Sequence, residues 1–139
     1  METVQVPTKT LGLFYTISRT LLGLLFAVMG LNGFLLFLPP PPPSAMPPLV
    51  VQWNTPMFAS HFIWMTAGFQ LLAGVLLLVN RYVLFALIVL AGILINILTF
   101  HLTMWPQTIV PLPIVALVLW FLTCWPLRDR FAVLFTARV

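Results

Sequence analysis

The chain has 139 residues, of which 62% are hydrophobic and only 6% are charged, and its formal net charge is +4. A soluble domain of this size carries about a quarter charged residues, so this composition excludes an ordinary globular protein in water. Basic residues beside long apolar runs are typical of membrane topology signals and argue against a nucleic-acid partner. We therefore expect one all-α membrane domain over residues 1–139, with the lipid bilayer as its surroundings.

The first predicted transmembrane helix covers residues 19–38, close to the roughly 20 apolar residues that a crossing needs. Its apolar run is longer than the core of an ordinary signal peptide, and no small-x-small cleavage site follows it. We interpret it as a membrane anchor, preceded by an interfacial lead-in of Leu13, Phe14 and Tyr15.

The second predicted helix covers residues 56–79, after a Pro-rich outer loop at 39–55. A run of prolines from Pro39 to Pro48 is expected to be extended and polyproline-like. Thr55 is the expected N-cap, and Pro56 occupies the first helical position, where its missing N–H costs nothing.

The third and fourth predicted helices cover residues 82–103 and 108–125. Only Asn80 and Arg81 separate the second helix from the third, and Asn tolerates the left-handed conformation that ends a helix. This spacing predicts an antiparallel hairpin. Pro111 and Pro113 fall near the first turn of the fourth helix, where proline is tolerated.

The basic residues indicate the orientation of the chain. On this assignment all six fall on one side of the membrane: Lys9, Arg19, Arg81, Arg128, Arg130 and Arg138. The positive-inside rule then predicts that both termini are cytoplasmic. The expected architecture is an up-down antiparallel bundle of four transmembrane helices in the inner (cytoplasmic) membrane, with Arg19 at the inner interface.

Three segments have recognisable motifs: NRYVLFALIVLAGILINILTFHL from Asn80, R-x-x-L-G-L-L-F-A-V-M-G-L-N-G-F from Arg19, and L-R-D-R-F-A-V-L-F from Leu127. Together they resemble the DoxX-like family of integral membrane proteins. The resemblance implies a four-helix membrane bundle related to subunits of quinone-linked oxidoreductases. The chain departs from the family pattern at Gln70, where relatives usually carry an acid, and at Gly33, where they often carry a lysine.

Two histidines are candidate ligands for a cofactor. His61 lies about 19 residues before the Asn80–Arg81 turn and His101 about 20 after it, so a rise of 1.5 Å per residue places both at a similar depth. A facing pair could ligate haem or a chlorophyll-type pigment, or bind a quinone head group. Alternatively, both are interfacial histidines that bond to water or to a backbone carbonyl.

Three amides complete the set of candidate cofactor-binding residues: Asn32, Gln70 and Asn96. Amides in transmembrane helices commonly bond to a neighbouring helix, and Asn96 recurs with Thr99 and Thr103 at helical spacing. We interpret them mainly as a polar seam inside the bundle. Gly23, Ala27 and Gly30 form a stripe of small residues against which another helix can pack closely, either within this chain or from a partner.

The residues that are missing restrict the function. The acids are Glu2 and Asp129, both outside the predicted spans, which excludes an Asp/Glu proton relay, and the single Cys124 excludes an internal disulfide. We identify no catalytic residues and no metal site. The leading hypothesis is a non-catalytic accessory subunit of a larger membrane electron-transfer complex, respiratory or photosynthetic. The alternative is a quinone-linked oxidoreductase subunit with its own site near His101, and a small-molecule carrier is a weaker third possibility.

Overall fold

The computed structural model describes residues 8–136, and every regular element in this range is helical, as expected. Four helices form the body of the molecule: α1 (Thr8–Leu35), α3 (Ile63–Leu78), α4 (Val83–Met104) and α5 (Leu112–Cys124). Two shorter helices are α2 (Pro48–Ala59) and α6 (Arg128–Ala132). Single 3₁₀ turns occur at Pro43–Ala45, Pro106–Thr108, Trp125–Leu127 and Val133–Phe135.

Three helical stretches of the described chain are long and apolar enough to cross a membrane: Lys9–Leu35, Val83–Met104 and Leu112–Phe135. Helices α2 and α3 together would make a fourth span, although they are bent by 82° at the break between them. Large apolar side chains are exposed on each of the four main helices, including Phe14, Phe69, Ile95 and Phe121. Such an extensive apolar surface is not stable in water, so the exposed faces indicate a membrane-embedded, multi-pass protein.

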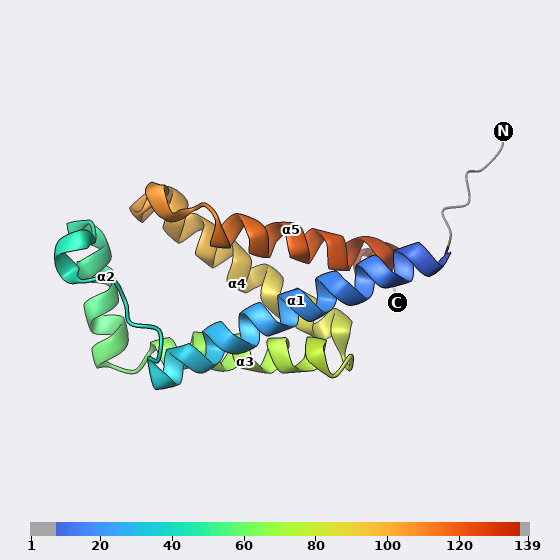
Figure 1. Cartoon of the computed structure of the whole chain (residues 1–139), viewed down its shortest axis with the longest axis horizontal. Coiled ribbons are helices and arrows are strands. Elements are labelled where there is room, and N and C mark those ends of the chain that lie inside the picture. The colour runs from blue at the N-terminus through green and yellow to red at the C-terminus, as the bar shows by residue number, and fades with distance from the viewer. Residues whose placement is uncertain (1–7, 137–139) are drawn as a thin grey trace.

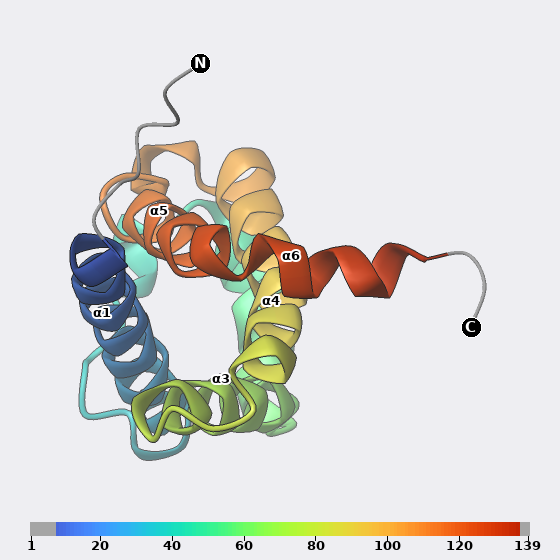
Figure 2. The same ribbon diagram turned by 90° about the vertical axis from the view of Figure 1, so that its right-hand side faces the viewer.

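The four main helices close into a ring, which Figure 2 shows end-on. Helix α1 packs against α3 and α5, and α4 packs against the same two helices from the other side. The buried core lies where these contacts meet and comprises Leu22, Phe26, Ala73, Leu77, Ala86, Leu87, Leu90, Leu94 and Ala116. Most of the core therefore comes from α1, α3 and α4.

The contact between α1 and α3 is close because glycines occupy it. A Cβ atom added to Gly30 would lie 2.4 Å from the backbone nitrogen of Leu71, and one added to Gly74 would lie 2.4 Å from the backbone nitrogen of Ala27. These separations are shorter than any van der Waals contact, so only glycine fits. The stripe of small residues predicted on the first helix therefore has a partner within this chain, and the partner is α3.

A tight reversal joins α3 to α4. Asn80 adopts a left-handed conformation with φ of 55°, as predicted, and its N–H donates to Leu77 O over 3.2 Å. The N–H of Arg81 donates to Leu76 O over 3.0 Å. These two hydrogen bonds form a Schellman motif, which satisfies carbonyl groups that the end of the helix would otherwise leave free. The third predicted helix agrees with α4 to within one residue at each end.

The first helix is longer at its start than predicted. Helix α1 begins at Thr8, not at residue 19, and includes the aromatic lead-in, because no proline or glycine pair interrupts this stretch. Helix α1 ends at Leu35, three residues before the predicted end at residue 38. Leu36 takes a left-handed φ of 51°, and the N–H of Leu38 donates to Asn32 Oδ1 over 2.7 Å.

The prediction for residues 39–79 is wrong in part. The chain is already helical from Pro48, which occupies the start of α2, so the predicted loop 39–55 ends early. Thr55 is not an N-cap, because its Oγ1 donates to Val51 O within the helix over 2.7 Å. The expected helix 56–79 is interrupted after Ala59, where His61 adopts a left-handed φ of 60°.

The fourth predicted helix, 108–125, begins late. Thr108 ends a 3₁₀ turn, and Pro111 takes the N-cap position of α5. Pro113 lies buried in the first turn, where its missing N–H is tolerated, as expected. Beyond Cys124 the helical path continues through a 3₁₀ turn at Trp125–Leu127 into α6.

Candidate functional site

A cavity of about 400 Å³ lies between the four main helices. Its wall is mostly apolar and contains three polar side chains, Gln70 from α3, His101 from α4 and Thr108 from the turn before α5. The apolar part comprises Leu25, Phe26, Met29, Ile97, Leu112, Pro113 and Ala116. A concave apolar wall with a few convergent polar groups is the usual form of a small-molecule site.

A short chain of hydrogen bonds orients His101. Its Nδ1 lies 2.7 Å from Thr108 Oγ1, and the Thr108 hydroxyl donates to Trp105 O over 2.8 Å. With the single hydroxyl proton directed to Trp105 O, the tautomer that fits carries its proton on Nδ1 and donates it to Thr108 Oγ1. In the neutral ring Nε2 is then the acceptor, and it makes no hydrogen bond to any residue from 8 to 136. His101 therefore retains one free nitrogen for a ligand.

Gln70 is the second polar group of the cavity. Its side chain is half-buried and makes no hydrogen bond with the described residues. The amide offers two N–H donors and one carbonyl acceptor. Gln70 and His101 are the two predicted site residues that the fold brings to one cavity.

His61 is not part of this cavity. It is exposed in the break before α3, and its ring stacks edge-on against Trp64 with centroids 4.4 Å apart. Helices α3 and α4 diverge from their shared turn, so that the beginning of α3 and the end of α4 lie well apart in Figure 1. His61 and His101 therefore do not share a site, although a similar depth was expected for both.

Asn32 and Asn96 also lie outside the cavity. Asn32 ends α1 by accepting the hydrogen bond from the Leu38 N–H, which is a structural role. Asn96 is exposed on α4, together with Thr99 and Thr103. The predicted polar seam on this helix therefore faces outward, because the rotation of α4 places Leu87, Leu90 and Leu94 against the core.

Two polar contacts in the interior were not predicted from the sequence. Arg19, expected at the interface, is 8% exposed, and its Nη1 donates to Leu77 O at the end of α3. Its Nε is buried without a partner in the described chain. Thr123 on α5 donates to Ser18 Oγ on α1 over 3.1 Å, and both residues are buried. The spacing of Arg19 from the small-residue stripe that begins at Gly23 could have indicated an inward direction for Arg19, because residues four apart share a helix face.

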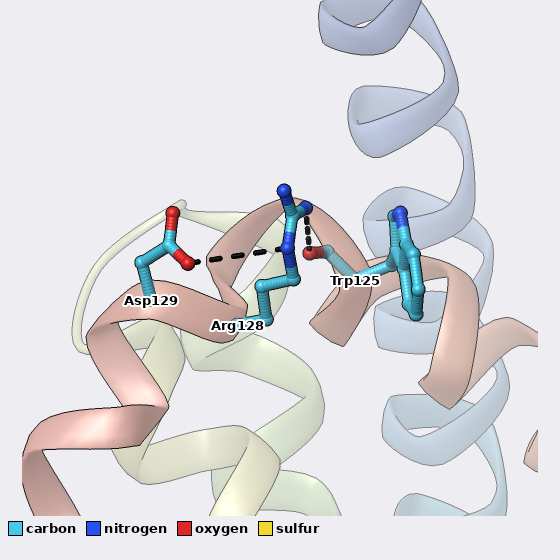
Figure 3. Close-up of polar contacts among 3 residues, drawn as sticks. All are labelled: Trp125, Arg128 and Asp129. Atoms are coloured by element: carbon cyan, nitrogen blue, oxygen red, sulfur yellow. Dashed lines mark hydrogen bonds and ion pairs between the residues drawn. The ribbon is translucent and has the colours of Figure 1, made fainter.

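The cluster around Arg128 lies on the surface. Figure 3 shows the Arg128 guanidinium between Asp129 and Trp125, with Nη1 3.1 Å from Trp125 O and Nε 3.9 Å from Asp129 Oδ1. The guanidinium carbon also lies 5.3 Å from the centre of the Trp125 ring. Exposed ion pairs contribute little stability, so this pair does not hold the fold together.

Fold and cavity together define a helical, multi-pass membrane protein with a mostly apolar cavity between its helices. Within residues 8–136, no three His, Cys, Asp or Glu side chains form a group that could hold a metal ion. No protein-family model, curated protein or solved structure matches the chain. The DoxX-like relationship therefore remains a prediction from the three segments quoted above.

Proposed function

We propose that this chain is an accessory membrane subunit of a larger electron-transfer complex. The observation that carries the subunit role is the exposed polar face of α4, formed by Gly92, Asn96, Thr99 and Thr103. The electron-transfer part rests on the resemblance to the DoxX-like family, which is an association and not a geometric argument.

The position of Asn96 makes this face unusual. It lies eight residues before Met104, the end of α4, which is about 12 Å along the helix axis and thus within the hydrocarbon core. Its amide makes no hydrogen bond with the described residues, and a Cβ added to the neighbouring Gly92 would meet no atom within 4 Å. An unpaired amide in lipid is costly, whereas a second transmembrane helix could both approach Gly92 and bond to Asn96.

We further infer that the chain crosses the inner membrane four times, with α2 and α3 forming one bent span and both termini cytoplasmic. This orientation is supported by Lys9 near the start of α1, by Arg81 in the α3–α4 turn, and by Arg128 and Arg130 in α6, because the positive-inside rule assigns basic helix ends to the cytoplasm. A reporter enzyme that is active only in the cytoplasm, fused after Val139, should be active. Activity confined to a reporter that requires export would contradict the orientation.

The subunit role is tested by replacing Asn96 with leucine in the complex purified from native membranes in mild detergent. We expect stoichiometric partner proteins with the unchanged chain, and a several-fold loss of them with Asn96→Leu, because the interhelical hydrogen bond is lost. Val118→Leu, on the exposed face of α5, is the matched control and should leave the partners in place.

Two outcomes would contradict this proposal. One is an unchanged chain that migrates as a monomer under the mildest solubilisation. The other is an assembly that contains only copies of this chain, since Asn96 would then mediate self-association and not attachment to a larger complex.

A second candidate function is favoured by the cavity that contains Gln70 and His101. A quinone carries two carbonyl oxygens, to one of which the Gln70 amide could donate, and its reduced form carries hydroxyl groups that could donate to His101 Nε2. The apolar wall formed by Leu25, Phe26 and Met29 would contact the hydrocarbon tail of the quinone. Haem or a chlorophyll-type pigment would instead need Nε2 as an axial ligand.

Quinone content of the purified chain tests this second function. We expect Gln70→Leu and His101→Phe each to weaken binding of an added ubiquinone analogue by about five- to tenfold, the effect of losing one hydrogen bond of roughly 1 to 1.4 kcal/mol. His61→Phe is the control, because His61 lies outside the cavity. If all three variants bind the analogue as tightly as the unchanged chain, this site is excluded. Visible absorption that depends on His101 would indicate haem or pigment instead.

A further inference from the structure

A second cavity, of about 670 Å³, opens at the end of the molecule where the α3–α4 turn meets α1 and α6. Figure 2 shows this end facing the viewer. Four polar side chains line the cavity, Tyr15, Asn80, Tyr82 and Arg130, beside apolar residues that include Phe85 and Leu127. It is separate from the cavity of His101 and has no residue in common with it.

The turn between α3 and α4 places the polar groups of this cavity. Asn80 and Tyr82 both have left-handed backbone conformations, with φ of 55° and 53°, which turn the chain sharply around Arg81. The hydroxyl of Tyr15 on α1 donates to Asn80 Oδ1 over 3.5 Å. That bond uses the oxygen of the Asn80 amide and leaves its NH₂ group available as a donor.

The cavity is electrostatically positive. Asp129 is the only acid within residues 8–136, and its carboxylate lies 3.9 Å from Arg128 Nε. Arg130 makes no ion pair with a described residue and lines the cavity with its side chain. Arg81 in the adjacent turn adds a second exposed positive charge. An anion at this end would therefore meet uncompensated positive charge.

We propose that this cavity binds the phosphate of an anionic phospholipid head group. The Arg130 guanidinium pairs with the phosphate oxygens, and the Tyr82 hydroxyl and the Asn80 NH₂ group donate further hydrogen bonds. Phe85 and Leu127 contact the glycerol and the first methylene groups of the acyl chains. The mixture of polar and apolar wall favours a lipid, because a free phosphate ion would leave the apolar part unused. The proposal does not depend on the function proposed above.

Native mass spectrometry of the purified chain in detergent with added phosphatidylglycerol tests the proposal. We expect one retained lipid on the unchanged chain, and about tenfold weaker retention for Arg130→Gln, because a charge-assisted pair is lost. Arg128→Gln is the matched control: it removes the same charge two residues away and outside the cavity, and should retain the lipid. Tyr82→Phe, a second variant that keeps the ring, should weaken retention to a smaller degree.

Four outcomes are decisive. Equal retention by the unchanged chain and Arg130→Gln would overturn the proposal, as would equal losses for Arg128→Gln and Arg130→Gln, which would mean diffuse surface charge. Full displacement of phosphatidylglycerol by inorganic phosphate alone would overturn the lipid source and leave a site for soluble phosphate. Retention of phosphatidylglycerol in excess inorganic phosphate, with loss only in the cavity variants, would support a lipid site.

Discussion

Replacing Gly30 with alanine is expected to lower the free energy of unfolding by about 3 kcal/mol, the upper part of the usual range for overpacking. The added methyl group would lie 2.4 Å from Leu71 N and 2.8 Å from Ala67 O, both of them backbone atoms of α3. Backbone atoms cannot move aside by changing a rotamer, so α1 and α3 would have to separate. This contact holds together the two helices that supply much of the core.

Gly12→Ala is the matched control in the same helix, because a Cβ at Gly12 would meet no atom within 4 Å. Helix propensity alone favours alanine over glycine by about 0.5–1 kcal/mol in a helix interior, so the control should be neutral or slightly stabilised. Propensity acts in the same direction at both positions, and only packing distinguishes them. Thermal unfolding of both variants in the same detergent measures the difference, and indistinguishable midpoints would contradict the close contact between α1 and α3.

Arg19→Met is expected to destabilise the chain by about 2 kcal/mol, the typical contribution of a hydrogen bond to a charged group. Arg19 is 8% exposed, and its Nη1 donates to Leu77 O, with Leu78 O 3.5 Å away. A positive charge at the carbonyl end of α3 also interacts favourably with the helix dipole. Methionine fills a similar volume and cannot donate, so the last carbonyl groups of α3 would lose this partner.

Arg128→Met is the matched control for Arg19. Arg128 likewise donates to a backbone carbonyl, that of Trp125, over 3.1 Å, but its side chain is 58% exposed. An exposed pair of this kind contributes less than about 1 kcal/mol. Unfolding by sodium dodecyl sulfate in mixed micelles compares the two variants, and hydrogen exchange should increase at the end of α3 only for Arg19→Met. Equal losses of stability would contradict a structural role for the buried guanidinium.

The sequence by itself determined the class of protein and the local signals of the chain. Charge depletion and apolar runs of about 20 residues predict a helical membrane protein whatever the packing. The helix from Val83 to Met104 and the left-handed Asn80 before it were also predictable, because both depend on neighbouring residues only. The bend before α3 was not, because Pro56 reads equally well as a helix start and as a residue within α2.

Only the tertiary structure determined which residues meet. Each main helix is apolar on most of its surface, so the sequence does not show which face turns inward. For this reason Asn96 was expected inside the bundle and lies outside, whereas Arg19, expected at the inner interface, packs against the end of α3 and is buried there. The same rotations bring His101 to Gln70 and not to His61. Depth follows from counting residues along a helix, whereas the direction of a side chain depends on contacts with helices far away in the sequence.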